Sequence, residues 1–387
     1  RRFVLKPYYG LTIRAAGITF TWRDEKSGSY RTFKKDRIQE IEKKIKGKKL
    51  KIIKIEAKKK KKNAPLLYDL TELQREANQK FGFSAKETLN IMQRLYENHK
   101  VLTYPRTDSR YLTSDVVGTI KDRLQAINSG VYREYAAPLL KKQITAKASF
   151  VNDSKVGDHH AIIPTEQAPS YLHMSNEEKK IYDMVVRRFL AVLYPSCEYE
   201  ETVITGMIEG EAFYAKGNRT IHRGWKAVYE NPVEDEEEEE LKKQELPAME
   251  KGQKEDVSAI RITEGKTKPP ARFTEGTLIT AMENPVKFME SSDRQMAKTL
   301  GETGGLGTVA TRADIIDKLF SSFLLEKGGG NLYHSQSQTA AGAGALRSEK
   351  TGADCALGNE TFSDRWRKAF GQKVYGGYQK VYGQSGR

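Results

Sequence analysis

The hydrophobic pattern changes its period along the chain, and this change restricts the fold more than any other feature of the sequence. Residues 1–66 show strand-like alternation, residues 67–195 repeat at helical spacing, and residues 196–260 return to short strand-like runs. A period of two is typical of strands and a period of about 3.6 of helices. A chain of 387 residues is also too long for one ordinary core. We therefore predict a multidomain α+β protein with a helical segment between two strand-rich ones.

Turn and cap residues mark the borders of the predicted helices. A helix is predicted from Leu70 to Phe81, because apolar residues recur there every three or four positions and Gly82 can end it. Ser84 and Glu87 then have the spacing of a capping box, in which each side chain bonds the backbone of the other residue. We expect a second helix directly after the first, with the apolar residues of both in the core.

The charge of the chain favours a polyanionic partner. Its net charge is +15 at pH 7, which fits a nucleic acid or an anionic membrane surface. No apolar run approaches the roughly 20 residues of a membrane span, and residues 1–6 lack the apolar stretch of a signal peptide. Cys197 and Cys355 stand far apart, so neither a four-ligand zinc site nor a disulfide framework is expected, and a reducing cytoplasm fits.

Three stretches differ in composition from a folded core. Lys58–Lys62 is an unbroken lysine run, which fits either a solvated linker or a DNA contact. Glu234–Glu240 is acidic throughout and is predicted to be a solvated loop, since like charges repel. Residues 328–387 hold 12 of the 31 glycines and no isoleucine, so we do not expect a packed domain there.

The densest group of reactive side chains lies at residues 103–112. Tyr104 stands two positions before Arg106, and Arg110 follows four positions later. A tyrosine has an ordinary pKa of about 10 and is a poor nucleophile unaided. A nearby guanidinium can stabilise the phenolate and neutralise charge on a phosphate, because its fork matches two phosphate oxygens. From these residues alone, Tyr104 is either a packed structural tyrosine or a nucleophile.

Two adjacent histidines form the second group. His159 and His160 stand in a polar turn that leads into Ile162 and Ile163. Imidazoles can donate to a phosphate or relay a proton. Neighbouring histidines seldom share one metal ion, and no third ligand follows at a useful spacing, so no metal ligand is predicted. A plain polar loop before a buried isoleucine pair is the alternative.

Two helix starts complete the set of candidate sites. Thr274 can cap a helix that runs through Met282, with Arg272 just before it, and a helix N-terminus is a natural phosphate site. A glycine-rich loop at residues 304–307 precedes a further helix, and glycines allow a ligand to approach the backbone closely. No lysine stands where a Walker A motif needs one, so ATP binding is unsupported. Each stretch alone also fits an ordinary helix start.

In this order and at these separations, the groups resemble the type IA DNA topoisomerases of the topoisomerase III kind. The resemblance covers roughly residues 1–327, and the stretch from Leu70 to Glu97 contributes to it. The four strings that carry it are Tyr-Pro-Arg-Thr-Asp-Ser from Tyr104, Asp-His-His-Ala-Ile-Ile-Pro-Thr from Asp158, Pro-Pro-Ala-Arg-Phe-Thr-Glu-Gly-Thr-Leu from Pro269, and Gly-Leu-Gly-Thr-Val-Ala-Thr-Arg-Ala from Gly305.

The resemblance implies an ATP-independent enzyme that breaks one DNA strand, passes a strand and religates, relaxing negative supercoils or decatenating DNA. Tyr104 would attack a phosphodiester, leaving a 5′-phosphotyrosine and a free 3′-hydroxyl, while Arg106 stabilises the phosphate. His159 would contact that phosphate or assist proton transfer. The residues expected to lie against DNA, preferentially single-stranded, are Asp108, Ser109, Arg110, His160, Arg272, Thr274, Glu275, Thr308, Thr311 and Arg312.

The same resemblance implies an architecture, a fragment of the toroid that type IA topoisomerases form. Its parts would be a β-rich arch that opens as a gate, made of residues 1–66 and 196–260; a helical domain carrying the active-site tyrosine, residues 67–195; a helical DNA-binding base, residues 261–327; and an atypical glycine-rich tail, residues 328–387. A frameshift, a disrupted gene or disorder would explain the tail.

The sequence also departs from the family pattern. The N-terminal Toprim domain, which supplies the acidic ligands of Mg²⁺, is not found before Tyr104, so this chain alone is expected to cleave poorly or not at all. Val309 stands where the family usually has proline, and the pattern ends after Lys327. The alternative function is a catalytically inactive remnant that only holds single-stranded DNA. A membrane-recruited protein is disfavoured, because no basic amphipathic helix is found. We expect DNA as partner, a helicase as a candidate second partner, and a cytoplasmic, nucleoid-associated location.

Overall fold

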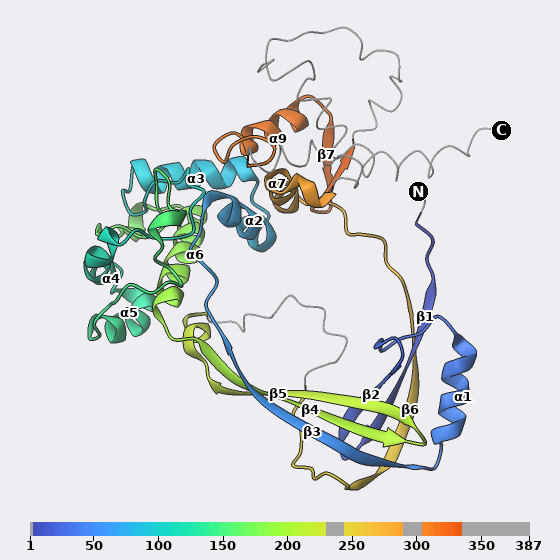
Figure 1. Cartoon of the computed structure of the whole chain (residues 1–387). Coiled ribbons are helices and arrows are strands. Elements are labelled where there is room, and N and C mark those ends of the chain that lie inside the picture. The colour runs from blue at the N-terminus through green and yellow to red at the C-terminus, as the bar shows by residue number, and fades with distance from the viewer. Residues whose placement is uncertain (1–2, 230–243, 289–303, 335–387) are drawn as a thin grey trace, which may run out of the picture. The chain divides into compact units, whose positions relative to one another are not determined.

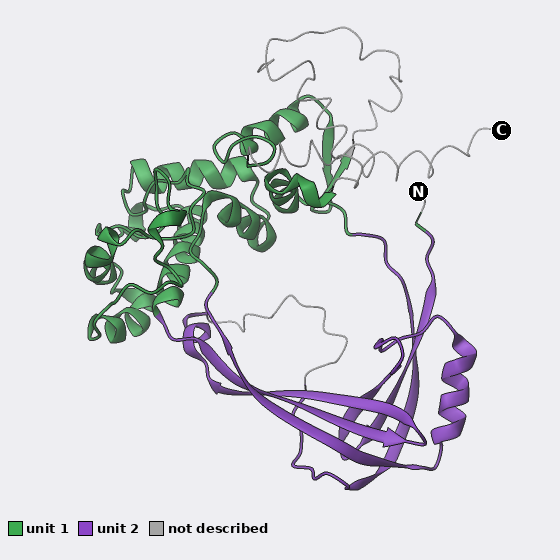
Figure 2. Cartoon of the chain, viewed as in Figure 1, with its two compact units in different colours: residues 1–3, 65–193, 271–387 green, residues 4–64, 194–270 purple. Residues whose placement is uncertain are grey.

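The computed structural model describes residues 3–229, 244–288 and 304–334, and it divides into two compact units (Figure 2). The barrel unit comprises residues 4–64 and 194–270, and the helical unit comprises residues 1–3, 65–193 and 271–387. The chain therefore crosses from one unit to the other at residues 64–65, 193–194 and 270–271, besides the crossing near its start. The predicted multidomain α+β class is confirmed. The acidic run 234–240 and residues 335–387 lie outside the described residues.

The barrel unit is a closed antiparallel barrel whose strands come from both halves of the chain (Figure 1). The strands follow one another around it in the order β1-β2-β5-β4-β3-β6. Register is continuous over long stretches, as in the pairing of β3 with β4 from Lys54↔Thr205 to Lys62↔Cys197, which follows a register shift between Ile52 and Lys54. The strand bounds are β1 Pro7–Ala15, β2 Ile18–Arg23, β3 Lys49–Lys62, β4 Cys197–Ile208, β5 Glu211–His222 and β6 Lys254–Lys266.

Alternating apolar residues of these strands fill the barrel. Phe20 and Trp22 on β2 are fully buried, with one polar position between them, as the period of a half-buried strand requires. Helix α1, Lys35–Ile45, lies in a stretch for which we predicted strands and turns only. Its buried residues Ile38, Ile41 and Ile45 stand three and four positions apart, which is a helical spacing. The helical period of these isoleucines was therefore present in the sequence, in the stretch between β2 and β3.

The lysine run belongs to a strand, so the linker interpretation is wrong. Lys58–Lys62 form the last part of β3 and pair with β4. Lys60 Nζ lies 2.7 Å from Glu201 Oε1, and Lys61 Nζ lies 2.8 Å from Glu198 Oε1. Cross-strand pairing thus offsets part of the positive charge that we considered for DNA contact. Both lysines remain exposed, so these pairs contribute little to stability.

The helical unit consists of short helices joined by long ordered loops (Figure 1). Its α-helices among the described residues are α2 Leu70–Phe81, α3 Ala85–Glu97, α4 Ile120–Ala126, α5 Arg133–Leu140, α6 Asn176–Leu193, α7 Glu275–Glu283 and α9 Arg312–Ser321. Short 3₁₀ helices lie at Asp115–Thr119, Gly130–Tyr132, Asp153–Lys155, Tyr171–His173 and Pro285–Phe288, and another, Gly224–Val228, belongs to the barrel unit.

The predicted caps of the helical unit are confirmed. Gly82 ends α2 in the left-handed region at φ 72°, which a glycine adopts without steric cost. Ser84 and Glu87 form the capping box of α3, with both reciprocal bonds present. Thr274 and Thr277 form the same arrangement at the start of α7. These borders are local, and the sequence alone located them.

One hydrophobic core joins α2 and α3 to α7 and α9. Leu70 and Leu89 pack in it with Met282 and Ile316, although about 190 residues separate the two pairs along the chain. The β-hairpin of β7, Leu325–Gly328, and β8, Asn331–His334, adds buried Leu332 to the same core. Residues 328–334, where we expected no packed structure, are thus ordered at least through this hairpin.

The sequence predicts neither a membrane span nor a disulfide framework, and the described residues bear on both predictions. Among residues 3–229, 244–288 and 304–334, no helix combines the length and apolar character that crossing a membrane requires. Cys197 is buried on β4 and carries a free thiol, whereas Cys355 lies outside the described residues.

Candidate active site

The tyrosine and histidine groups lie side by side, although more than 50 residues separate them. Thr103 N donates to Ile163 O over 3.0 Å, and Ile163 N donates to Thr103 Oγ1 over 3.0 Å. Thr165 N also donates to Val101 O over 3.0 Å. These bonds place residues 101–103 along residues 161–165. The segment that follows, with Tyr104, therefore faces the segment with His159.

Tyr104 and His159 are in ring contact. Their ring centroids are 4.2 Å apart with an interplanar angle of 36°, and Tyr96 meets the Tyr104 ring edge-on at 5.6 Å. Tyr104 is half-buried and His159 is exposed. Thr107 Oγ1 donates to His159 O over 2.8 Å, which fixes the backbone of the histidine relative to the tyrosine segment. The phenol and the imidazole are thus presented together.

Arg106 connects the tyrosine segment to the glycine-rich loop. Its Nη1 donates to Ala310 O over 3.3 Å, and its side chain is half-buried. One guanidinium nitrogen is used in this bond, and a guanidinium has five N–H donors in all. Arg106 therefore joins two of the four predicted groups and keeps donors that can face a phosphate.

The glycine-rich loop is held against the end of α7. Leu306 N donates to Met282 O over 2.7 Å, and Gly305 has φ +96°. A Cβ at Gly305 would lie 2.3 Å from Met282 O and 2.5 Å from Glu283 O, which no side chain tolerates. The glycine is therefore required by the close approach of protein backbone, where we expected the close approach of a ligand.

Two threonines of this loop lie at the surface before α9. Thr308 and Thr311 are exposed, and their hydroxyl oxygens are 3.0 Å apart. Thr308 N donates to Thr311 Oγ1 over 2.9 Å, so the turn is held by its own side chains. Both exposed threonines lie on the loop that Arg106 contacts.

Three of the residues expected to touch DNA are buried instead. Ser109 is 3% exposed, and its Oγ donates to Lys155 O over 2.9 Å. Arg312 is 3% exposed, and its Nη2 donates to Gly304 O over 2.6 Å and its Nε to Leu306 O over 3.3 Å. These side chains shape the loops that carry the site and have no surface for a DNA contact in this structure.

Glu275 is the third buried residue, and it ties helices together. Its Oε1 accepts from Ala85 N over 2.7 Å, and its Oε2 lies 2.7 Å from Lys327 Nζ. One oxygen of the buried carboxylate thus accepts a hydrogen bond and the other forms an ion pair, so Glu275 links α7 to α3 and to β7. Thr274 caps α7 through its hydroxyl, and Arg272 is exposed with its guanidinium 4.6 Å from the centroid of the Tyr333 ring. Of this motif, Arg272 is the side chain that presents positive charge to solvent.

The two histidines differ in environment. His160 is half-buried, and its Nδ1 lies 2.7 Å from Ala161 O, a bond that requires the proton on Nδ1. Burial lowers the pKa of the His160 imidazole, and the positive charge of Arg123 adds to this effect. His160 is therefore neutral at pH 7 and bonded to its own loop, while the exposed His159 carries the ring contact with Tyr104.

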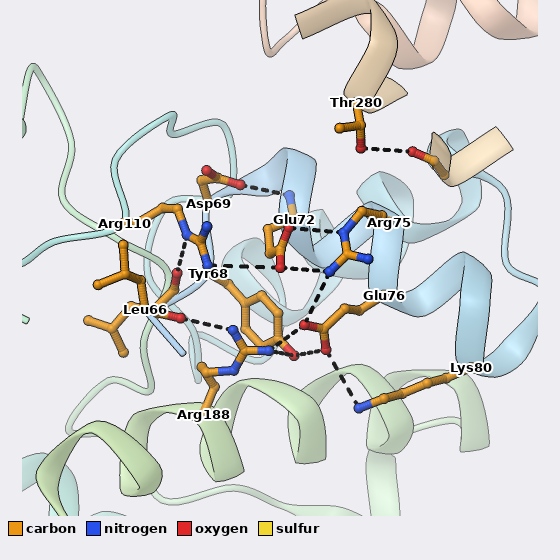
Figure 3. A network of polar contacts seen from close by, with 12 residues as sticks. Leu66, Tyr68, Asp69, Glu72, Arg75, Glu76, Lys80, Arg110, Arg188 and Thr280 are labelled. Atoms are coloured by element: carbon orange, nitrogen blue, oxygen red, sulfur yellow. Dashed lines mark hydrogen bonds and ion pairs between the residues drawn. The ribbon is translucent and has the colours of Figure 1, made fainter. Parts of the chain in front are cut away.

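Carboxylates and guanidinium groups gather behind the tyrosine segment. Arg110 Nε donates to Leu67 O over 3.1 Å, and Arg110 Nη2 lies 3.8 Å from Glu72 Oε1 (Figure 3). Burial raises the pKa of the Asp69 carboxyl to about 7, although the bond from Glu72 N and the charge of Arg110 oppose this. Burial also raises the pKa of the Glu283 carboxyl. Asp108, in contrast, is exposed, and a carboxylate there can accept from a base but repels a phosphate.

These acids do not form a metal site. Among the described residues, no three His, Cys, Asp or Glu side chains are arranged to hold a metal ion. Arg110 and Arg312 stand close enough to the acids to interact with them electrostatically, and positive side chains compete with a cation. The side chains of the described ranges thus do not fit Mg²⁺.

Sequence reasoning missed the residues that support the site from behind. Asp69, the cap of α2, accepts from Glu72 N over 2.7 Å, and its position before a predicted helix was a usable signal. Arg188 on α6 and Glu76 on α2 form a buried ion pair. Their spacing of 112 residues carries no signal, because nothing local links a helix to a partner that far away.

Comparisons with known proteins find similar sequences over most of the chain. The sequence matches the DNA topoisomerase family over residues 1–338. DNA topoisomerase 3 of Bacillus subtilis strain 168 is 52% identical over 331 residues, which cover 86% of this chain and 46% of that protein. DNA topoisomerase 3 from a strain of Bacillus cereus is 53% identical over 335 residues, with the same coverage. The chain spans about half the length of the curated relatives it matches.

A solved structure is also similar. Full-length topoisomerase I from Thermotoga maritima matches with a TM-score of 0.62 and 25% sequence identity, over 86% of this chain and 50% of that one. The similar region in sequence extends eleven residues beyond Lys327, to residue 338, and so includes the β7–β8 hairpin.

Proposed function

This chain belongs to the type IA DNA topoisomerases and is similar to topoisomerase III, and on that premise we propose that Tyr104 cleaves one DNA strand covalently. The observation that carries the proposal is the contact of the Tyr104 ring with the His159 ring at 4.2 Å, in a segment that also holds Arg106. A phenol can act as a nucleophile, an imidazole can transfer a proton, and a guanidinium can stabilise charge on a phosphate.

In the proposed reaction, the Tyr104 oxygen attacks the phosphorus of a phosphodiester and loses its proton. A tyrosine–phosphorus bond forms, the bond to the 3′ oxygen breaks, and that oxygen leaves as a hydroxyl after taking up a proton. His159, whose ring contacts Tyr104, passes this proton, and Arg106 neutralises the charge that gathers on the phosphate. Religation is the reverse attack by the 3′-hydroxyl. Bond energy is kept in the phosphotyrosine, so ATP is not consumed.

The DNA strand is proposed to lie over the exposed side chains around this centre. Thr308, Thr311 and Arg272 are exposed on the same unit as Tyr104. A single strand leaves its phosphates and bases accessible, which such a surface of hydroxyls and a guanidinium can contact. Strand passage, followed by relaxation of supercoils or decatenation, completes the proposed activity. A helicase partner and a nucleoid location are further proposals that follow from the family.

The test uses a 3′-labelled oligonucleotide. It is incubated with Mg²⁺ and the chain, by itself or together with a separately expressed Toprim domain, and the protein is examined for label on denaturing gels. Because the proposed adduct holds the 5′ end of the downstream fragment, the 3′ label should migrate with the protein, and Tyr104→Phe should abolish it. Labelled Tyr104→Phe protein would refute the assignment. An oligonucleotide that binds without forming any adduct, even with Toprim present, would favour the alternative of a binding protein without catalysis.

A further inference from the structure

Residues 66–70 are a short segment that connects the site to the rest of the helical unit. The segment follows the crossing of the chain at residues 64–65, and α6 ends at Leu193, directly before the next crossing. Arg188 on α6 reaches the segment twice. Its Nη1 donates to Leu66 O over 2.9 Å, and its Nη2 donates to Tyr68 Oη over 2.9 Å (Figure 3). One guanidinium thus holds both the backbone and a side chain of this segment.

Both halves of the candidate site bond to the same segment. Arg110, from the tyrosine segment, donates through Nε to Leu67 O over 3.1 Å. Ile162, from the histidine segment, donates through its backbone N–H to Tyr68 O over 2.8 Å. Successive carbonyl groups of residues 66, 67 and 68 therefore accept bonds from α6, the tyrosine segment and the histidine segment.

A further bond continues this connection toward the reacting groups. Leu70 N donates to Thr107 O over 3.1 Å, and Thr107 Oγ1 donates to His159 O over 2.8 Å. Thr107 is three residues after Tyr104, and it is buried. Residues 66–70 are thus bonded to both segments, in addition to the direct bonds between those segments.

Arg188 is itself fixed in a buried, charged environment. It is 3% exposed, forms a close ion pair with Glu76, and lies with its guanidinium carbon 4.0 Å from the centroid of the Tyr68 ring. Tyr68 Oη donates to Glu76 Oε2 over 2.6 Å. Burial raises the pKa of the Glu76 carboxyl, but Arg188, the Tyr68 hydroxyl and Lys80 outweigh burial and hold that pKa below its ordinary range. The Arg188–Glu76 pair is therefore charged, and the Tyr68 side chain contacts both of its members.

We infer that Arg188 is a positioning residue for strand cleavage, which aligns Tyr104 with His159 by holding residues 66–70 between α6 and both halves of the site. The inference rests on the proposed function. Arginine is required because its planar fork reaches Leu66 O, Tyr68 Oη and Glu76 together, whereas a lysine ammonium keeps the charge but not the fork.

The experiment compares the same substitution at two adjacent positions of α6. Arg188→Lys is the test and Arg187→Lys the matched control, because Arg187 is also buried but its Nε bonds Asp183 of the same helix at 2.9 and 3.0 Å. Both proteins are combined with Toprim and saturating oligonucleotide, and the rate of adduct formation is measured. Since a misplacement of about 1 Å can slow a reaction by about 100-fold, we expect Arg188→Lys to be slower by about 10- to 100-fold, with oligonucleotide affinity unchanged.

A second readout needs neither DNA nor activity. The Tyr104 ring shifts the resonances of the His159 ring lying 4.2 Å from it, and NMR of histidine-labelled protein detects this shift. The chain has six histidines, and His159→Gln assigns the signal. Arg188→Lys should move the His159 signal toward its value in Tyr104→Leu, and Arg187→Lys should leave it in place.

The outcomes separate this inference from the proposed function. If wild-type protein forms no adduct, the proposed function fails, while the histidine signal still reports on positioning. If wild type forms the adduct and Arg188→Lys equals Arg187→Lys in adduct rate and in the His159 signal, the inference is overturned. Should Arg188→Lys not fold, Tyr68→Phe answers the question, because it removes only the hydroxyl between Arg188 and Glu76. A folded Tyr68→Phe protein with wild-type rate and signal also overturns the inference.

Discussion

The guanidinium of Arg106 donates a hydrogen bond to the backbone oxygen of Ala310, over 3.3 Å. This bond crosses 204 residues of sequence and joins the tyrosine segment to the loop before α9. Arg106 thereby has two roles in the proposed reaction, as a link between loops and as a partner of the phosphate.

Replacing Arg106 should impair cleavage more than binding. Arg106→Gln keeps a donor for Ala310 but removes the positive charge, so adduct formation should slow by about 100- to 1000-fold, as for the loss of a group that stabilises developing charge. The measurement is the initial rate of adduct formation with Toprim present. Arg94→Gln is the control, because Arg94 is bonded to Glu178 at 2.7 Å and is not part of the site. Equal rates in the two variants would contradict the role of Arg106.

The two histidines should respond differently to substitution. His159→Ala removes the imidazole beside Tyr104 and should slow adduct formation by about 100-fold or more. His160→Ala should mainly lower stability, because its Nδ1 bonds Ala161 O and its ring is half-buried. Adduct rates and unfolding midpoints of both variants check this. A His160 variant that is the slower of the two would reverse the assignment.

The pH dependence of stability offers a second check on His160. Burial lowers the pKa of its imidazole below the ordinary 6.5. As pH falls below about 6.5, the unfolded chain takes up a proton at this residue before the folded protein does, so stability is lost on acidification. His160→Gln should therefore lose less unfolding free energy than wild type between about pH 7.5 and about pH 5.5, in urea titrations at both pH values. A larger loss would contradict the burial of this side chain.

Asp69 should make the protein less stable as pH rises. The pKa of its carboxyl is raised to about 7, from an ordinary 3.8, so the folded protein holds a proton that the unfolded chain has lost in that interval. The free energy of unfolding therefore falls as the pH rises from about 4 to about 7, and it falls no further from this cause above that range. Asp69→Asn keeps an oxygen for Glu72 N but carries no charge, so it should improve stability more at about pH 8 than at about pH 5.

Chemical denaturation at both pH values measures this effect. Asp115→Asn is the control, because the Thr113 hydroxyl lowers the pKa of the exposed Asp115 and its shift has the opposite sign. An Asp69→Asn protein whose advantage is the same at both pH values would show that the Asp69 carboxyl is charged throughout.

Gly305 should be intolerant of any side chain. Gly305→Ala places a methyl group against Met282 O and Glu283 O at a positive φ, and should cost about 1–3 kcal/mol of unfolding free energy. Gly304→Ala is the matched control, since Gly304 has φ +72° but open space around the position of a Cβ. Thermal or urea unfolding of the pair separates backbone strain from the clash. Equal losses would mean that the loop can move away from α7.

The local features of this protein were readable in its sequence. The end of α2 at Gly82, the capping box of Ser84 and Glu87, and the cap of α7 at Thr274 were all predicted and are confirmed. Each depends on residues at most four positions apart, so the pattern of side chains nearly determines the backbone there. The family was readable for the same reason, because its strings are contiguous. Helix α1 was missed although its isoleucine period is equally local.

The sequence by itself thus determined the end of α2, the starts of α3 and α7, and which reactive side chains the chain has. Only the tertiary structure decided which of these side chains face one another, which are buried, and which bond to other groups of the protein. It closed a barrel by pairing strands as distant in sequence as β1 and β6, brought the Tyr104 ring against the His159 ring, and buried Arg312 and Glu275, which were expected to lie against DNA. The physical reason is that contact and desolvation arise between segments distant in sequence, which no local pattern of residues specifies.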